Sequence, residues 1–231
     1  MADLIAIVED EFSLRHNYAD LFRAHGYDVT TYATRAAASM GFRRRKPSLA
    51  LIDIGLEDDK NGGFDLCQEM RSIYPLMPII FLTARDNDID KISGLRLNAD
   101  DYLTKDISLA HLIERVARLL RRTEAFNSPI SQSEIFQRGS LKLELSRLNA
   151  YWNDKKVKLT LSEFDIVRAL ARHPGHVKSR EQLIKDSEAF GFIDPETITS
   201  HIKRIRKKFL NVDKNFDAIR TRYGAGYSWN S

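Results

Sequence analysis

The sequence predicts two domains: a (βα)5 doubly wound α/β parallel sheet, followed by an α+β domain that contains a helix-turn-helix. Two observations predict this order. Short apolar runs alternate five times with helical spacing in the first half, whereas short strands, capped helices and a hairpin follow in the second. The chain has 231 residues, which is enough for two ordinary domains.

The charge balance differs between the two halves. Residues 1–130 contain 17 Lys and Arg against 20 Asp and Glu, whereas residues 131–231 contain 19 against 12. The basic half is therefore the candidate for nucleic-acid binding.

The single cysteine, Cys67, excludes a disulfide framework and a Cys-based zinc site. A reducing cytoplasm fits this cysteine usage, and no apolar run approaches the roughly 20 residues of a membrane span.

Five apolar runs in the first half predict the strands of the sheet. These runs are Leu4–Val8, Asp28–Tyr32, Leu49–Ile54, Ile79–Thr83 and Asp101–Leu103. The last helix of this half ends at Arg122, and residues 123–137 show no clear period and contain Ser, Asn and Pro. We therefore expect domains at residues 1–122 and 138–231, joined by a linker.

Helix start signals organise the second half. Thr160 with Glu163, and Ser179 with Gln182, form capping boxes that begin two helices. Asp194 before a proline begins a third, and Gly224 and Gly226 predict a hairpin near the end. The third helix and the hairpin are expected at Pro195–Leu210 and Ile219–Trp229.

Polar residues follow four strands of the predicted parallel sheet. Glu9 and Asp10 follow the first, Asp53 ends the third, Thr83 ends the fourth and Lys105 follows the fifth. Ligands bind at the carboxyl ends of such strands, and crowded carboxylates favour Mg²⁺. Asp53 could then form an aspartyl phosphate, with Mg²⁺ and Lys105 neutralising phosphoryl charge. Acids that follow a single strand can be present only because the dipole of the next helix favours negative charge at its start. Polar residues at the ends of four strands favour a ligand-binding site instead.

Residues 1–122 resemble the receiver domain of two-component systems, which is flavodoxin-like. The segments VEDE, LIDIG and GLRLNADDYLTK carry the resemblance. It implies that a histidine kinase phosphorylates Asp53. It also implies Mg²⁺ ligands, a switch pair and a phosphate-binding cation. The implied residues are Glu9, Asp10, Asp53 and Gly55 for the metal, Thr83 and Tyr102 for the switch, and Lys105 for the phosphate.

Two departures from the receiver pattern stand beside the predicted site. The loop after Asp53 lacks the usual Pro, is two residues longer and carries three extra acids at 57–59. Asp106 replaces the Pro that normally follows Lys105 through a cis bond. A cis bond before a non-Pro residue costs about 3–4 kcal/mol. Either this bond is trans and Lys105 approaches differently, or strain is held there.

The third helix of the second half has an apolar and a basic face. Its apolar stripe is Ile198, Ile202, Ile205 and Phe209, and the opposite face carries Thr197, Ser200, Lys203, Arg204 and Lys207. Such a helix suits the major groove, because cations meet phosphates and Arg can bond guanine. A solvated basic face is the alternative.

The second half resembles the OmpR/PhoB effector domain, a winged helix. TLSEFDIVRALARHPGHVKSREQL, TITSHIKRIRKKF and RTRYGAGYSW carry the resemblance. It implies promoter DNA as a partner, and RNA polymerase as a further one. The implied roles are base or groove contact for Ser200, Lys203 and Arg204, and phosphate contact or helix anchoring for Thr197 and Arg206. Lys207 adds charge, and Arg222 replaces the wing Arg that usually directly precedes the Gly-x-Gly.

The family resemblance also implies that active receivers form a two-fold homodimer. By position, its participants are Lys91, Arg96, Asp100, Asp101, His111, Arg115 and Arg118. His111 and Arg96 stand where the family often has acids, and a two-fold contact counts each change twice. We therefore expect a dimer that is weaker than usual.

Together these features predict a phosphorylation-controlled transcription factor and not an enzyme. The whole-chain pattern is most similar to regulators of the proteobacterial dedicated sortase system. One alternative is a regulator that binds DNA without phosphorylation. Another is a Mg²⁺-dependent Asp-nucleophile phosphatase, which would need a second Asp at the position of Gly55 as general acid.

Overall fold

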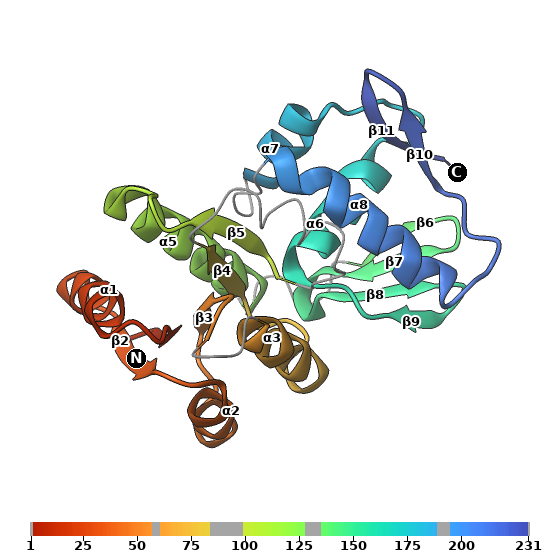
Figure 1. Ribbon diagram of the computed structural model, residues 1–231. Coiled ribbons are helices and arrows are strands. Elements are labelled where there is room, and N and C mark those ends of the chain that lie inside the picture. The colour runs from red at the N-terminus through yellow and green to blue at the C-terminus, as the bar shows by residue number, and fades with distance from the viewer. Residues whose placement is uncertain (1, 57–60, 84–98, 128–134, 189–194, 231) are drawn as a thin grey trace. The chain divides into compact units, whose positions relative to one another are not determined.

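The computed structural model describes residues 2–56, 61–83, 99–127, 135–188 and 195–230. The chain divides into two compact units, Met1–Leu120 and Arg121–Ser231, each with its own sheet (Figure 1). Within the described ranges, every helix is too short or too polar to cross a membrane.

The sheet of the first unit has five parallel strands in the order β2-β1-β3-β4-β5. The strands are β1 Leu4–Val8, β2 Asp28–Tyr32, β3 Leu49–Asp53, β4 Ile79–Thr83 and β5 Asp101–Thr104. Strands β1, β3 and β4 are buried along their whole length, as in sheets that helices cover on both faces. The strand order reverses between β1 and β3, which places a crevice at their carboxyl ends.

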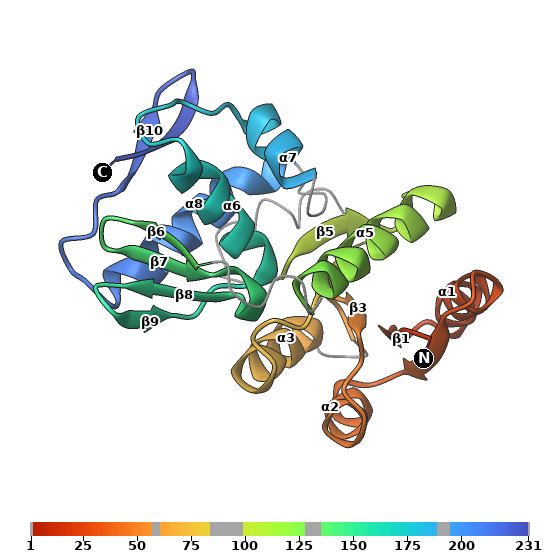
Figure 2. The ribbon, with the colours of Figure 1, turned by 180° about the vertical axis from the view of Figure 1, so that it is seen from behind.

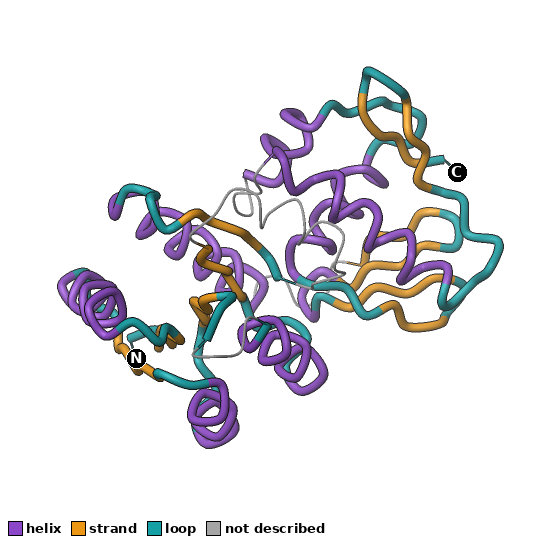
Figure 3. The backbone as a smooth tube through the Cα atoms, in the orientation of Figure 1, coloured by secondary structure: helices purple, strands orange, loops and turns teal. Residues whose placement is uncertain are grey.

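Helices cover both faces of this sheet. They are α1 Phe12–Ala24, α2 Arg35–Arg44, α3 Gly62–Ile73 and α5 Leu109–Asn127. Core clusters place α1 and α5 on one face, and α2 and α3 on the other. Figure 3 shows these helices in purple around the orange strands. The predicted doubly wound α/β fold is confirmed.

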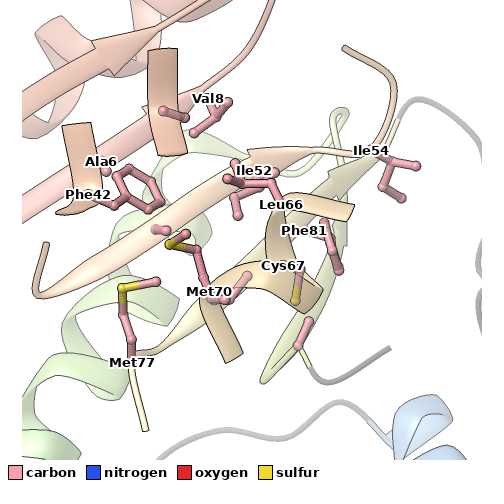
Figure 4. Close-up of a cluster of buried hydrophobic side chains, with 14 of the residues drawn as sticks. Ala6, Val8, Phe42, Ile52, Ile54, Leu66, Cys67, Met70, Met77 and Phe81 are labelled. Atoms are coloured by element: carbon pink, nitrogen blue, oxygen red, sulfur yellow. The ribbon is translucent and has the colours of Figure 1, made fainter. Parts of the chain in front are cut away.

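The core beneath α3 contains the only cysteine of the chain. Leu66, Cys67 and Met70 of α3 face Ile52 and Phe81 of the sheet (Figure 4). Cys67 is fully buried in this cluster. Its role is therefore apolar packing.

The second unit combines an antiparallel sheet, three helices and a terminal hairpin (Figure 2). Its elements are β6 Ile135–Arg138, β7 Leu141–Glu144, a 3-10 turn Leu145–Arg147, β8 Asn149–Trp152, β9 Lys155–Val157, α6 Leu161–Arg172, α7 Arg180–Glu188, α8 Pro195–Leu210, β10 Ile219–Arg222 and β11 Gly226–Trp229. Both predicted capping boxes form, with reciprocal bonds between Thr160 and Glu163 and between Ser179 and Gln182. The predicted winged helix is confirmed.

The wing hairpin β10–β11 is tied to the turn before α7. Lys178 and Tyr227 exchange backbone hydrogen bonds of 2.8 and 2.9 Å. Gly226 has φ 131°, and a Cβ there would lie 2.0 Å from the Lys178 carbonyl oxygen. Only glycine fits this close approach.

The structure shortens the linker that the sequence predicts at 123–137. Helix α5 continues to Asn127, and strand β6 begins at Ile135. Residues 123–127 extend the helix because Thr, Glu, Ala, Phe and Asn do not break one as a proline does, and the first proline comes at Pro129. Only 128–134 of the predicted linker lie between the two elements, outside the described residues.

Candidate functional site

Three carboxylates meet at the carboxyl ends of β1 and β3. Strand pairing sets Val8 beside Ile52, so that Glu9, Asp10 and Asp53 follow on neighbouring strands. One ligand atom from each carboxylate lies within 4.8 Å of the others. Glu9 and Asp53 are buried, whereas Asp10 is exposed. The sequence prediction that these three groups come together is consistent with this geometry.

Lys105 lies against two of these carboxylates. Its Nζ is 2.8 Å from Asp53 Oδ2, and 2.9 and 2.8 Å from the two oxygens of Glu9. Burial by itself lowers the pKa of Lys105, but its bonds to Asp53 and Glu9 outweigh burial and raise that pKa. All peptide bonds between described residues are trans, including the one from Lys105 to Asp106. The trans alternative therefore holds, and Lys105 still reaches Asp53.

Negative charge exceeds positive charge in this cluster. Burial raises the pKa of Glu9 to about 7, with the nearby Asp53 charge acting in the same direction and Lys105 opposing both. One lysine does not neutralise three crowded carboxylates. Their oxygens therefore suit a hard divalent cation. Glu9, Asp10, Asp53 and the carbonyl of Gly55 would hold Mg²⁺ here, and the bound ion would supply positive charge beside Asp53.

The two predicted switch residues lie on neighbouring strands. Thr83 is buried at the end of β4, the strand that pairs with β3 beside Asp53. Tyr102 of β5 is also buried, and its ring centroid lies 5.5 Å from that of Phe81. Tyr102 therefore packs in the core beneath α3 in this structure.

Arg15 is a site residue that the sequence reasoning missed. Its Nη1 donates to the carbonyl of Glu9 at 2.6 Å and to that of Asp10 at 2.8 Å. These bonds fix the acidic turn after β1 from the start of α1. An Arg five positions after Asp10 was the available signal, because the start of a helix then faces the preceding turn.

Asp100, a predicted dimer contact, lies inside the receiver instead of on its surface. Its carboxylate is 0% exposed, is 2.6 Å from Arg71 Nη2 and accepts the Ile79 N–H at 3.1 Å. Arg71 also donates to the carbonyls of Pro75 and Met77. A buried charge needs such partners, so Asp100 serves the interior of the receiver and not the dimer surface that the sequence predicted.

The remaining predicted dimer residues have different positions. Asp101 is 1% exposed and pairs with Arg115 of the same chain at 2.9 Å. Arg118 pairs with Glu114 along α5, and His111 is exposed. Lys91 and Arg96 lie outside the described residues.

The predicted DNA-contacting residues occupy α8 and the wing. Lys203 and Lys207 are exposed on α8, and Ser200 is partly exposed. Arg222 is exposed at the end of β10, next to Tyr223, which is 97% exposed. The backbone of Thr197 is helical, whereas its side chain is not among the described ones.

Arg206 joins α8 to the wing. Its Nε and Nη2 donate to the Ile219 carbonyl at 3.1 and 2.9 Å, and Nη2 donates to Thr221 Oγ1 at 2.9 Å. Burial lowers the pKa of Arg206. Of the two roles that the resemblance implied for Arg206, these contacts match helix anchoring.

Arg204 does not lie on the exposed face that the sequence assigned to it. Its side chain is 10% exposed, with Nε 3.5 Å from Glu163 Oε1 and Nη2 2.7 Å from His201 Nδ1. Position 204 lies one turn from His201, on the side of α8 that meets α6. The buried carboxylate of Glu163 attracts it there.

Comparisons with known proteins agree with both units. Residues 5–117 match the response regulator receiver domain, and residues 154–229 match the transcriptional regulatory protein, C terminal, family. The chain is 31% identical over 228 residues to the transcriptional regulatory protein CreB of Escherichia coli strain K12, covering 98% of this chain and 97% of CreB. It is 35% identical over 234 residues to the regulatory protein VanR of Enterococcus faecium, covering 98% of each.

A solved structure supports the fold along the whole chain. A RitR mutant aligns with a TM-score of 0.75 at 19% identity, covering 100% of both chains. The curated relatives match nearly end to end, and the two matched domains follow one another in this chain in the expected order. The chain therefore belongs to the OmpR/PhoB family of two-component response regulators, which are DNA-binding regulators of transcription.

Proposed function

We propose that a histidine kinase controls this transcription regulator by phosphorylating Asp53 with the help of Mg²⁺. The observation that carries the proposal is the position of the Asp53 carboxylate. Asp53 ends the buried strand β3, and its carboxylate lies beside those of Glu9 and Asp10. Lys105 Nζ is 2.8 Å from Asp53 Oδ2. A buried acid with excess neighbouring negative charge is typical of a functional site.

The chemistry is a phosphoryl transfer from phosphohistidine. An Asp53 carboxylate oxygen attacks phosphorus, so that the O–P bond forms while the N–P bond breaks and its electron pair stays on the imidazole. Lys105 is already at Asp53 Oδ2 and can follow the charge onto the phosphoryl oxygens. The Thr83 hydroxyl can donate a hydrogen bond to a phosphoryl oxygen. Bound Mg²⁺ supplies further positive charge.

The signal would pass from the phosphoryl group to the surface through Thr83 and Tyr102. Both are buried, on paired strands β4 and β5, so a shift of Thr83 changes the space beside Tyr102. We expect this shift to promote a receiver homodimer, which places two winged helices on two DNA half-sites. DNA contact is assigned to Thr197, Ser200, Lys203, Lys207 and Arg222, with RNA polymerase as a further partner in a cytoplasmic setting.

The two alternatives differ from this proposal at identifiable residues. A regulator that binds DNA without phosphorylation would not need the set of Glu9, Asp10, Asp53 and Lys105. A small-molecule phosphatase would need an acid to protonate the leaving group, but Gly55 stands at that position. The receiver is therefore assigned only its own phosphorylation and dephosphorylation.

The test is phosphorylation of the full chain by acetyl phosphate and Mg²⁺, measured by intact-protein mass. The wild type should gain one phosphoryl group and Asp53→Asn should gain none. Asp65→Asn, which changes an acid of α3 outside the cluster, is the matched control and should still be modified. Equal phosphorylation of Asp53→Asn and the wild type would refute the assignment.

A further inference from the structure

Helix α8 carries three stripes of side chains at helical spacing. The first is the buried core stripe, which contains Ile198, Ile202, Ile205 and Phe209. The second, here named the anchor stripe, contains His201, Arg204 and Lys208. The third, here named the groove stripe, contains Ser200, Lys203 and Lys207. The two polar stripes lie on different sides of the helix, so they can have different partners.

One buried carboxylate of α6 holds the anchor stripe. Glu163 is 0% exposed, and its Oε2 lies 2.5 Å from Lys208 Nζ and accepts the Thr160 N–H at 2.8 Å. Its Oε1 lies 3.5 Å from Arg204 Nε. Two cations of α8 therefore meet a single acid in the first turn of α6.

His201 contacts a second nitrogen of the Arg204 guanidinium group. Arg204 Nη2 lies 2.7 Å from His201 Nδ1, and the imidazole is fully buried. A guanidinium group has only donors, so Nδ1 of His201 is the acceptor. Arg204 is thus held between an acid of α6 and a histidine of its own helix.

Moving Arg204 into a DNA groove would break these contacts. It would leave the buried oxygens of Glu163 and the nitrogen of His201 with fewer partners, which is unfavourable. Lys203 and Lys207 are exposed and face no such cost. Lysine can donate to guanine O6 and N7, so the groove stripe can read sequence without Arg204.

We infer that Arg204 is a positioning residue, which fixes the angle of α8 on α6 through Glu163 and His201. The groove stripe makes the sequence-dependent contacts with DNA. This inference rests on the proposed function of α8 as the helix that enters the major groove.

The test compares Arg204→Ala with Lys203→Ala in the full chain. Binding is measured on a selected DNA site, and on variants with each base pair changed in turn, at several salt concentrations. Arg204→Ala should lower affinity by the same factor on every sequence, with an unchanged salt slope. Lys203→Ala should remove roughly tenfold or more of the preference at one base pair.

Two results for Arg204→Ala would overturn the inference. One is a relaxed preference at a single base pair, which is the effect of losing a base contact. The other is a salt slope smaller by about 0.9, which is the effect of losing a phosphate contact. If Lys203→Ala and Lys207→Ala lost neither preference nor slope, the major-groove assignment of α8 itself would be refuted.

A second pair of variants separates positioning from general unfolding. Fluorescence of Trp152 and Trp229, both in this unit, reports whether each variant is folded. Arg204→Lys keeps a cation opposite Glu163 and should recover part of the affinity, with sequence preference unchanged. Glu163→Gln combined with Arg204→Ala should lose less affinity than the product of the two single losses. No recovery, or fully independent losses, would contradict an action through Glu163.

Discussion

Each domain buries carboxylates beside basic side chains, but in opposite proportions. In the receiver, Glu9 and Asp53 share Lys105, and Asp10 lies in the same cluster. In the winged helix, the one carboxylate of Glu163 is bonded by Lys208 and approached by Arg204. The first cluster has more acids than cations and one exposed carboxylate, whereas the carboxylate of the second is fully enclosed.

The difference is one of charge balance: the acids of the receiver cluster outnumber its cations, whereas Glu163 is paired with two cations. Burial, together with the neighbouring negative charge, raises the pKa of Glu9 to about 7, and a cation would relieve it. Glu163 already has cations and a backbone N–H, so an added ion has nothing to relieve. The balance of charges around each buried acid therefore separates the candidate reactive site at Glu9 from the structural ion pairs at Glu163.

The largest expected effect is at the enclosed cluster. Glu163→Ala leaves Lys208 and Arg204 without their buried acid and should lower the free energy of unfolding of the winged helix by about 3–5 kcal/mol. Urea unfolding followed by tryptophan fluorescence measures it, because both tryptophans lie in this domain.

Glu181→Ala, at an exposed position of α7, is the matched control and should change little. Asp53→Asn sharpens the comparison, because removing one of three crowded acids should barely alter the unfolding of the receiver. A Glu163→Ala variant as stable as the wild type would show that the enclosed cluster does not hold α8.

The next effect concerns Asp100. Asp100→Ala leaves the buried guanidinium of Arg71 without its acid, and should lower the receiver's free energy of unfolding by about 3 kcal/mol. Arg118→Ala removes an exposed pair with Glu114 along α5 and should cost about 0.3–0.5 kcal/mol. Far-UV circular dichroism during urea unfolding measures both. If Asp100→Ala weakened only a dimer and left monomer stability intact, its interior role would be wrong.

Mg²⁺ should act on one cluster and not on the other. At ten times its dissociation constant, Mg²⁺ should raise the free energy of unfolding of the receiver by about 1.4 kcal/mol, and a chelator should reverse this. The tryptophan-detected transition of the winged helix should not move. Glu9→Gln should reduce the gain, whereas Glu11→Gln, on an exposed acid outside the cluster, should keep it. An equal gain in Glu9→Gln would remove Glu9 from the site.

The smallest effect is expected at the wing. Arg222→Ala should make the salt slope of DNA binding less negative by about 0.9, the change for one phosphate contact. Arg220→Ala is the control, because Arg220 already pairs with Asp217 beside the same hairpin. Equal slopes for the wild type and Arg222→Ala would place the wing off the DNA backbone.

Much of the fold could be predicted because local patterns determine it. Continuous apolar runs marked β1 and β4 to the residue, since both are buried on two faces. Capping boxes marked the starts of α6 and α7. The clustering of Glu9, Asp10 and Asp53 could be predicted because parallel strands bring their carboxyl ends to one edge of the sheet.

What escaped prediction depends on partners that are distant in sequence. Adjacent acids Asp100 and Asp101 look alike in the sequence, and only the fold brings Arg71, on another element, to the first. The apolar stripe of α8 shows which side faces the core, but not that Glu163 of α6 lies beside Arg204. Arg15 was missed because its partners are backbone carbonyls, which every residue has, so the spacing of Arg15 from Asp10 was the only signal.

DNA binding with and without beryllofluoride tests the central claim, that the acidic edge of the receiver controls the winged helix. The full chain is titrated with its selected site in Mg²⁺, with beryllofluoride added or omitted, for the wild type and Asp53→Asn. We predict that beryllofluoride tightens wild-type binding and leaves Asp53→Asn unchanged. Equal wild-type affinity in both conditions, or an equal response of Asp53→Asn, would contradict control through Asp53.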